Sequence, residues 1–397
     1  FVGEVWPGKS GFPSFTNKEV RLWWGGHVKE FMKTGIAGIW CDMNEPSSFT
    51  GPFPSSVTFL GDEKRDLKNA EAHNIYAHYM SMSTYNAILE ETKTRPFVIT
   101  RAAYSGTHKY ATFWTGDNHS IWSHLRLTIP QMLNMGLSGQ SLVASDIGGF
   151  GGDTNKELLI RWIELGALSP ICRNHSAFGT RRQEPYTFDS ETTFIYKKHI
   201  ELRYSLLPYL YDCFYNEQID KLPPMRPLIL KYKDDPETIN INSQFMFGKN
   251  LLVAPVLNQG ETKKMVYFPD TFYDYYTKEK FTKGYKIVDA PLDSLPLFVA
   301  KNTIIPSYKK RSRVLDYYDT ICLSVFGNFA QYQTMYDDGL TLDLEKNDLI
   351  VFHVKNDLLS VTYKRYKSSQ HYKNLTLIYR EKTYNFKLKG VNETFLL

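Results

Sequence analysis

Short apolar segments alternate with segments of helical periodicity along the first half of the chain. The apolar segments occupy residues 1–6, 36–41, 97–101, 110–114, 142–146 and 171–175, and helices are expected over 17–32, 70–92, 120–135, 154–168 and 190–218. Apolar segments of this length are typical of buried strands, and their alternation with helices predicts a parallel sheet covered by helices. The alternation breaks once, where the link between the segments at 97–101 and 110–114 is too short for a helix.

A polar or aromatic side chain stands at the end of nearly every apolar segment. These residues are Trp6, Asp42, Arg101, Asp117, Asp146 and His175. In a (β/α)₈ barrel, the C-terminal ends of all the strands gather on one face, and that face carries the chemistry. We therefore predict an α/β fold of the TIM-barrel type, with these side chains on its functional rim.

About six strands are too few to close a barrel of eight. The chain begins Phe1-Val2-Gly3, without Met, in what reads as the middle of a strand, so we expect a preceding portion with the first two strands. Residues 1–220 are accordingly predicted to form a partial barrel, strands 3–8. Beyond residue 220, prolines and short alternating segments predict a proximal β-sandwich over 221–310 and a distal one over 311–397.

Composition excludes several classes of function. The net charge of +5 is spread thinly without a long basic run, so no nucleic-acid partner is expected. No apolar stretch approaches the length of a membrane span, so no membrane partner is expected. Four cysteines fit no metal or redox spacing and favour a reducing, cytoplasmic compartment. No metal or other cofactor is expected, and a homo-oligomer is left open.

Asp42 and Asp117 are the candidate catalytic pair. Two carboxyl groups at strand ends on one rim can flank a glycosidic bond, where one protonates the leaving oxygen and the other attacks the sugar carbon or activates water. Acids are abundant in the chain, so such a pair can also arise by coincidence. His175 alone could equally be a structural histidine, and Arg101 with Asp146 could equally form a structural ion pair.

Several motifs resemble glycoside hydrolase family 31, the α-glucosidase family. Residues 40–46, Trp-Cys-Asp-Met-Asn-Glu-Pro, are similar to its nucleophile signature, and residues 114–118, Trp-Thr-Gly-Asp-Asn, are similar to its acid/base segment. Further family-like segments lie in the family's order at residues 5–8, 100–101, 145–150, 173–176 and 183–185. The resemblance covers roughly residues 1 to 310, and the distal module matches only as a generic sandwich.

The resemblance implies a retaining, exo-acting α-glucosidase that hydrolyses oligosaccharides. Asp42 would be the nucleophile, and Asp117 would be the acid/base that first protonates the departing oxygen. Three side chains would bind the hydroxyls of the terminal sugar, and six would wall a pocket closed at one end. The hydroxyl-binding residues are Arg101, Asp146 and His175, and the wall residues are Trp6, Trp40, Met43, Phe49, Trp114 and Phe150.

Other functions remain open from sequence. An α-xylosidase or an α-transglucosidase of the same family would use the same two carboxylates, although the sequence around Asp42 favours glucose. A non-catalytic sugar-binding relative should have lost one carboxylate, and both Asp42 and Asp117 are present. A protein that truly began at Phe1 would lack part of the expected barrel and sugar pocket, and would be an inactive fragment.

Overall fold

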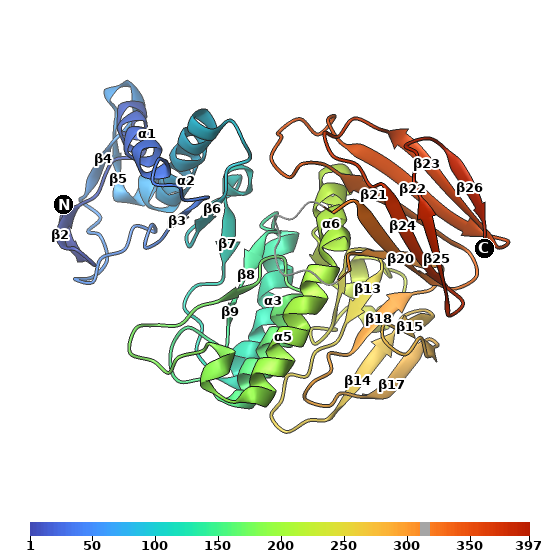
Figure 1. Ribbon diagram of the computed structural model, residues 1–397. Coiled ribbons are helices and arrows are strands. Elements are labelled where there is room, and N and C mark those ends of the chain that lie inside the picture. Colours follow the sequence, from blue (N-terminus) through green and yellow to red (C-terminus); the bar gives the residue numbers. More distant parts are fainter. Residues whose placement is uncertain (310–317) are drawn as a thin grey trace. The chain divides into compact units, whose positions relative to one another are not determined.

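The computed structural model describes residues 1–309 and 318–397, which form two compact units (Figure 1). The first unit comprises residues 1–116 and 138–143, and the second comprises residues 117–137 and 144–397. The domain boundary predicted between residues 310 and 311 lies outside the described residues.

The first unit contains a parallel sheet with two long helices. Its elements are β1 (Val2–Val5), β2 (Gly8–Gly11), α1 (Lys18–Met32), β3 (Ile39–Cys41), β4 (Thr58–Leu60), β5 (Asp66–Lys68), α2 (Asn69–Thr92), β6 (Val98–Thr100) and β7 (Thr112–Trp114). β6 pairs in parallel with both β3 and β7, and β8 (Val143–Ala144) follows β7 in the strand order. The parallel arrangement predicted for these strands is thus confirmed.

The first segment departs from that prediction. β1 pairs antiparallel with β2 in a separate hairpin, so residues 1–6 are no strand of a parallel sheet. β2 begins directly after the turn with Gly8, whose φ of +98° is a conformation that glycine adopts without steric cost. A two-residue connection of this kind can only reverse the chain, which is why the hairpin forms here.

α1 and α2 lie side by side and cover the sheet (Figure 1). α1 starts where the Asn17 side chain accepts hydrogen bonds from the backbone N–H groups of Glu19 and Val20, as an N-cap does. Buried apolar side chains from both helices, from β3 and β6, and from the residue before β7 then form one cluster: Val28, Met32, Cys41, Ala87, Ile88, Val98 and Ala111.

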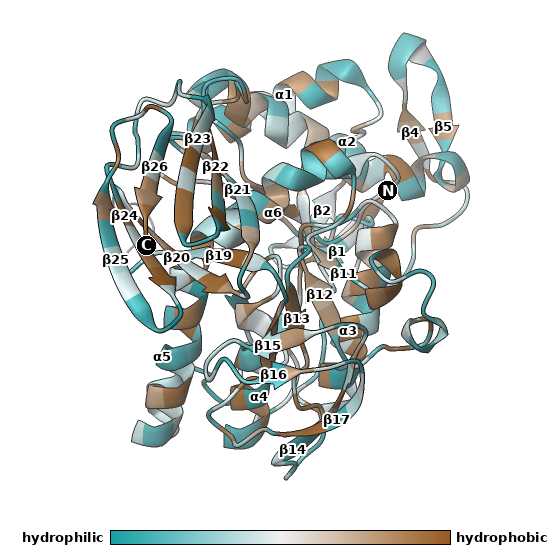
Figure 2. Ribbon diagram, turned by 90° about the vertical axis from the view of Figure 1, so that its right-hand side faces the viewer, coloured by the Kyte–Doolittle hydropathy of each residue, from teal (hydrophilic) through white to brown (hydrophobic). Residues whose placement is uncertain are grey.

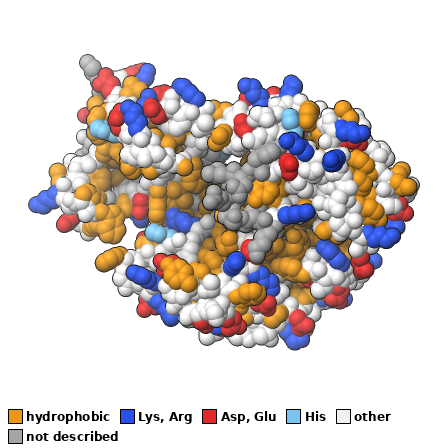
Figure 3. Space-filling view, in the orientation of Figure 1, with side chains coloured by type: hydrophobic (Ala, Val, Ile, Leu, Met, Phe, Trp, Pro, Cys, Tyr) orange, Lys and Arg blue, Asp and Glu red, His pale blue; other side chains and the backbone are white. Residues whose placement is uncertain are grey.

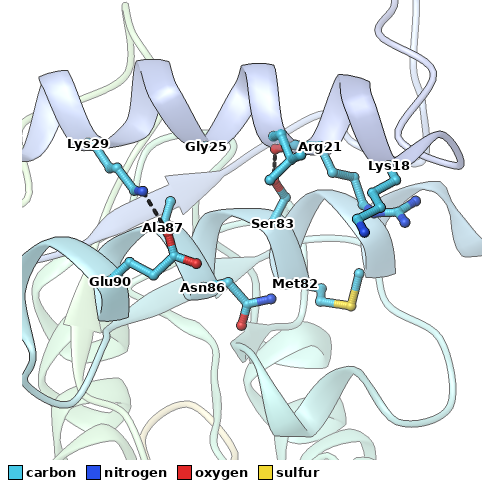
Figure 4. Close-up of a pocket in the computed structure, with 10 residues that line it drawn as sticks. Lys18, Arg21, Gly25, Lys29, Met82, Ser83, Asn86, Ala87 and Glu90 are labelled. Carbon is cyan, nitrogen blue, oxygen red and sulfur yellow. Dashed lines mark hydrogen bonds and ion pairs between the residues drawn. The ribbon is translucent and has the colours of Figure 1, made fainter.

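A shallow surface groove runs between the two helices (Figure 4). Gly25 and Ala87 face each other across it, and their small size lets the helices approach closely. Ser83 donates a hydrogen bond to the backbone oxygen of Arg21, and Lys29 forms an ion pair with Glu90 farther along. These three contacts follow the same order along both helices, one turn apart. The two helices therefore run in the same direction, as in consecutive β–α repeats.

The second unit begins with further parallel strands and helices. Its elements up to residue 220 are α3 (Trp122–Leu137), the end of β8, β9 (Asp146–Ile147), α4 (Lys156–Ala167), β10 (Arg173–Asn174), α5 (Ser190–Ser205) and α6 (Leu207–Asp220). β9 and β10 pair in parallel. The single long helix predicted over 190–218 is interrupted at Leu206, and α6 begins with Pro208 in its first turn, where proline is tolerated.

Antiparallel sheets follow, as the alternating segments predict. The strands between residues 221 and 309 are β11 (Met225–Arg226), β12 (Phe245–Phe247), β13 (Leu251–Val253), β14 (Lys263–Phe268), β15 (Phe272–Asp274), β16 (Lys280–Phe281), β17 (Gly284–Asp289), β18 (Leu297–Ala300) and β19 (Thr303–Ser307). Six of them form a sheet of order β11-β12-β13-β18-β15-β16, and β14 pairs with β17. The side chains of β12 and β13 are fully buried, and these strands are drawn in the hydrophobic colour (Figure 2).

The last part of the chain forms two four-stranded sheets. Its strands are β20 (Thr320–Phe326), β21 (Ala330–Tyr336), β22 (Asp348–Lys355), β23 (Leu358–Arg365), β24 (Asn374–Tyr379), β25 (Lys382–Lys387) and β26 (Glu393–Leu396). The sheet orders are β19-β20-β24-β25 and β21-β22-β23-β26. β20 and β24 pair in parallel, whereas the other pairs in these two sheets are antiparallel.

A buried carboxyl group joins α6 to β21. Asp212 accepts hydrogen bonds from the backbone N–H of Met335 at 2.7 Å and from the hydroxyl of Tyr332 at 2.9 Å. Burial raises the pKa of Asp212 to about 7, although these hydrogen bonds oppose the rise. The folded protein therefore holds a proton at mildly acidic pH that the unfolded chain releases near pH 4.

This carboxyl group should make stability depend on pH. Between about pH 4 and pH 7, wild-type stability is expected to fall as pH rises, because Asp212 must be ionised while buried. Asp212→Asn keeps a neutral side chain at every pH. The melting temperature of the wild type minus that of this variant should therefore decrease from about pH 4 to pH 7. Differential scanning calorimetry at several pH values measures it, with Asp66→Asn on exposed strand β5 as the control. A constant difference would contradict the buried-acid assignment.

Candidate active site

Asp42 lies directly after β3 with its carboxylate accessible to solvent. Its Oδ1 accepts a hydrogen bond from the backbone N–H of Met43 at 2.8 Å, and 42% of its side-chain surface is exposed. Met43 has a φ of +50°, a left-handed conformation that costs a non-glycine residue about 1–2 kcal/mol. The sharp turn at Met43 directs this N–H group back to the carboxylate, so the backbone itself orients Asp42.

Arg101 holds two carboxylates at once. Its Nε and Nη2 donate to the two oxygens of Glu45 at 2.7 and 3.0 Å, and its Nη1 lies 3.3 Å from Oδ1 of Asp42. Burial by itself would raise the pKa of Glu45, but hydrogen bonds from Arg101 and Ser47 outweigh it and lower that pKa. Glu45 therefore stays ionised and fixes the guanidinium of Arg101 next to Asp42.

A buried asparagine ties together the loops that carry these groups. The Asn44 side chain donates to the hydroxyl of Thr100 at 2.8 Å and accepts from the backbone N–H of Ala102 at 3.2 Å. Asn44 follows β3, whereas Thr100 and Ala102 lie at the end of β6 and just beyond it. Both hydrogen-bonding sides of its amide are used, so the segments carrying Asp42 and Arg101 are locked to each other.

Four of the predicted wall residues form two aromatic pairs in the first unit. Trp40 meets Trp114 edge to face at a ring-centroid distance of 5.1 Å, and Trp6 meets Phe49 in the same way at 5.0 Å. Trp114 is buried, whereas Trp40, Trp6 and Phe49 are exposed. Edge-to-face contact fixes ring orientation and leaves the exposed rings with open faces, which can pack against the apolar side of a sugar.

In the second unit, Asp146 is a fully buried carboxylate paired with Arg173. Nε and Nη2 of Arg173 lie 2.7 and 2.5 Å from Oδ1 of Asp146. The two residues are direct partners in the parallel pairing of β9 with β10, so the strand register brings the charges together. A charge buried this deeply needs such a partner, because desolvation without one would be prohibitive.

The glycine-rich loop after β9 packs against the chain that follows Asp117. A Cβ atom on Gly149 would lie 2.4 Å from the backbone nitrogen of Ser120, so only glycine fits there. The Asn118 side chain donates to the backbone oxygen of Asp146 at 3.1 Å and accepts from the backbone N–H of Phe150 at 3.0 Å. Asn118 thereby fixes the start of the loop to its own segment.

Phe150 and His175 stack with a centroid distance of 5.3 Å and an interplanar angle of 27°. The backbone N–H of Ala177 donates to the Phe150 oxygen at 2.9 Å, which joins the segment after β10 to the glycine-rich loop. Asp117 is exposed at the beginning of this unit, one residue before Asn118. The second unit thus gathers Asp146, Phe150 and His175, as the first gathers Asp42 and Arg101.

Several residues that shape these surfaces were given no role from sequence. Glu45, Asn44, Asn118 and Arg173 lie inside the quoted motifs, where the first three follow the acids Asp42 and Asp117 and Arg173 precedes His175. Gln183 is a fifth, and its amide donates to the backbone oxygen of Gly149 at 2.6 Å. Four of them share a signal, because each is a polar residue within ten positions after a predicted strand end, whereas Arg173 lies inside the predicted strand over 171–175.

Two other features, a metal-binding cluster and a membrane-spanning helix, are absent from the described parts of the chain. Residues 1–309 and 318–397 contain no group of three or more His, Cys, Asp or Glu side chains arranged to hold a metal ion. Within the same ranges, no helix combines the length and the apolar character needed to cross a bilayer.

Two sequence models of one family match the chain in succession. The glycosyl hydrolases family 31 TIM-barrel domain matches residues 1–213, and the glycosyl hydrolase family 31 C-terminal domain matches residues 221–305. The first match runs continuously from Asp42 through Asp117, across both structural units. Together the matches confirm the predicted fold class, a TIM-type barrel followed by a C-terminal β domain.

Individual proteins agree with these matches. The chain is 41% identical over 362 residues to alpha-glucosidase 2 of Bacillus thermoamyloliquefaciens, covering 89% of this chain and 46% of that protein. A family 31 dextranase from Flavobacterium johnsoniae, complexed with glucose, superposes with a TM-score of 0.86 at 31% identity, covering 95% of this chain and 50% of that one. A glucosidase II alpha subunit bound to Glc1Man2 gives 0.88 at 27% identity, covering 99% and 48%.

The chain therefore spans less than half the length of the curated relatives it matches. The first family model alone covers more than half of the 397 residues. The predicted resemblance is confirmed, and the chain belongs to glycoside hydrolase family 31.

Proposed function

We propose that the protein carrying this chain is a retaining, exo-acting α-glucosidase that acts on oligosaccharides. The observation that carries the proposal is the exposed Asp42 carboxylate, oriented by its own backbone and by an arginine that a second carboxylate holds. The α-glucosidases among the relatives support glucose as the sugar. On the face that Figure 3 shows, acidic and basic side chains are interspersed.

The proposed reaction has two displacement steps. In the first, an Asp42 oxygen attacks the anomeric carbon and forms a β-glycosyl ester, while the bond to the leaving oxygen breaks and Asp117 donates a proton to that oxygen. In the second, Asp117 takes a proton from water, the water oxygen bonds to the same carbon, and the Asp42 ester bond breaks. Two inversions leave the released sugar in the α configuration of the substrate.

Other side chains have supporting roles in this proposal. Arg101, Asp146 and His175 hydrogen-bond the hydroxyls of the terminal sugar, where bonds that strengthen in the transition state raise the rate. The remaining six predicted residues form the walls. They are Trp6, Trp40, Met43, Phe49, Trp114 and Phe150.

Two further expectations remain proposals. Residues 1–220, 221–310 and 311–397 are proposed as barrel, proximal sandwich and distal sandwich, which the two family-model matches support for the first two. A reducing, cytoplasmic compartment is supported by the four cysteines, none of which is paired in a disulfide.

Removal of the nucleophile gives the first test. Asp42→Ala should lower turnover of an aryl α-glucoside by roughly a thousandfold or more, because no ester can form. Azide should restore part of the activity and yield a β-glucosyl azide, since it enters the space left on that side of the sugar. Asp289→Ala, an exposed position in β17, serves as the control. Near-wild-type turnover by Asp42→Ala would refute the assignment.

The stereochemistry gives a second test that needs no variant. Proton NMR during the first minutes of hydrolysis should show the α-anomer of glucose before mutarotation equilibrates the two forms, because the proposed mechanism inverts the anomeric carbon twice. A β-anomer as first product would exclude the double displacement. Faster release of xylose than glucose from matched aryl glycosides would instead assign the protein as an α-xylosidase.

The arginine clamp gives a third test. Glu45→Gln removes the charge that fixes Arg101 but keeps the size of the side chain, and hydrogen bonds between charged groups contribute about 1.5–3 kcal/mol. We expect kcat/KM to fall about tenfold to a hundredfold. Glu90→Gln removes a carboxylate from the exposed ion pair with Lys29 and should leave the rate unchanged. Equal rates for the two variants would show that Glu45 does not position Arg101.

A further inference from the structure

A polar pocket lies in the second unit where three parts of the chain meet. α6, the turn between β12 and β13, and β21 surround a volume of about 330 Å³. None of the proposed active-site residues lines it. We call it the α6–β21 pocket, and the residues used below are Tyr209, Asn216, Arg226, Lys249, Asn250 and Gln331.

Arg226 is the buried cation of the pocket. Only 3% of the residue is exposed, and two backbone oxygens hold it, that of Pro223 2.7 Å from Nε and that of Leu222 3.3 Å from Nη2. The third guanidinium nitrogen, Nη1, forms no hydrogen bond with the residues that the structure describes, and no carboxylate within ion-pair distance of Arg226 occurs among them. A guanidinium held rigidly on one side and open on the other is preorganised for an oxyanion.

Three carboxamide side chains surround the pocket and make no hydrogen bonds to other described residues. Asn216 lies two turns after Tyr209 on the same face of α6, Asn250 follows the β12–β13 turn, and Gln331 lies in β21. The Tyr209 hydroxyl fixes the turn, because it donates to the Phe247 oxygen at 2.7 Å and accepts from the Asn250 N–H at 3.1 Å. Uncommitted carboxamides both donate and accept, which suits hydroxyl groups.

The charges around the pocket leave an excess of one cation. Lys249 is paired with Asp220 at 3.2 Å, so its charge is balanced, whereas that of Arg226 is not. Lys231 lies outside the lining. Burial lowers its pKa to about 8 against the attraction of Asp270, and repulsion from Arg226 and Lys249 makes a smaller contribution. A ligand with a single negative group would balance the site.

We propose that the α6–β21 pocket binds one sugar-sized polyol that carries a phosphate or carboxylate group. The oxyanion would meet Nη1 of Arg226, and the hydroxyls would meet Asn216, Asn250 and Gln331. The volume lies at the lower end of the range for small-molecule sites, which suits a single ring. Since the ligand would touch α6 and β21 together, its binding should also raise the melting temperature.

Isothermal titration calorimetry with glucose 6-phosphate, glucuronate and glucose tests the proposal. Glucose 6-phosphate or glucuronate should bind at millimolar concentration or below, and the comparison of the two shows whether phosphate or carboxylate is preferred. Glucose, which has no anionic group, should not bind to the α6–β21 pocket. The double variant Asn216→Leu/Gln331→Leu should weaken binding of the anionic sugars at least about tenfold, because two hydrogen-bonding amides are lost.

Gln218→Leu is the matched control, because Gln218 is an exposed carboxamide on α6 that does not line the pocket. It should bind both anionic sugars as the wild type does. The proposal would be overturned if neither glucose 6-phosphate nor glucuronate bound to the wild type. It would also be overturned if the double variant bound these sugars with wild-type affinity. Since neither variant touches the proposed catalytic groups, unchanged hydrolysis of an aryl α-glucoside would show that the double variant is folded.

Discussion

The parallel register of β3 and β6 is the constraint on which the geometry around Asp42 and Arg101 depends. Cys41 pairs with Thr100, and the N–H of Arg101 bonds the Cys41 oxygen at 3.2 Å. Asp42 and Arg101 therefore leave the sheet at the same level. Because side chains alternate between the faces of a sheet, a shift of one residue would send one of them to the other face. The ion pair is thus a consequence of backbone pairing, and Glu45 and Asn44 only fix its geometry.

In the second unit, strand register likewise brings together an ion pair, and here the pair is buried. Asp146 and Arg173 are register partners of β9 and β10, and the buried carboxylate is stable because the guanidinium is delivered by the adjacent strand. The glycine-rich loop adds a steric requirement, since Gly149 touches the backbone beside Ser120. The Asp146–Arg173 ion pair fixes the relative position of β9 and β10. The close backbone contact at Gly149 fixes the position of the loop, and Phe150 in that loop stacks on His175.

α6 is the last helix before the β-rich half of the chain, and it contacts β21 in that half. The same face of α6 carries Asp212, whose buried carboxyl group binds β21, and Tyr209 and Asn216, which line the α6–β21 pocket. Both the docking of β21 and the shape of the pocket depend on the same few turns of α6.

Sequence alone determined the order of strands and helices, the parallel pairing and the family, because apolar periodicity and motif order are local properties of the chain. The helix over residues 70–92 and the parallel pairing of the segments at 36–41 and 97–101 are examples. It did not determine that residues 1–6 form a hairpin or that the helix over 190–218 breaks at Leu206. Only the tertiary structure decided which partner each charge has: Glu45 for Arg101, Arg173 for Asp146 and none for Nη1 of Arg226 among the described residues. The physical reason is that ion pairing depends on strand register and on burial, which join residues far apart in sequence and leave no periodic signal within it.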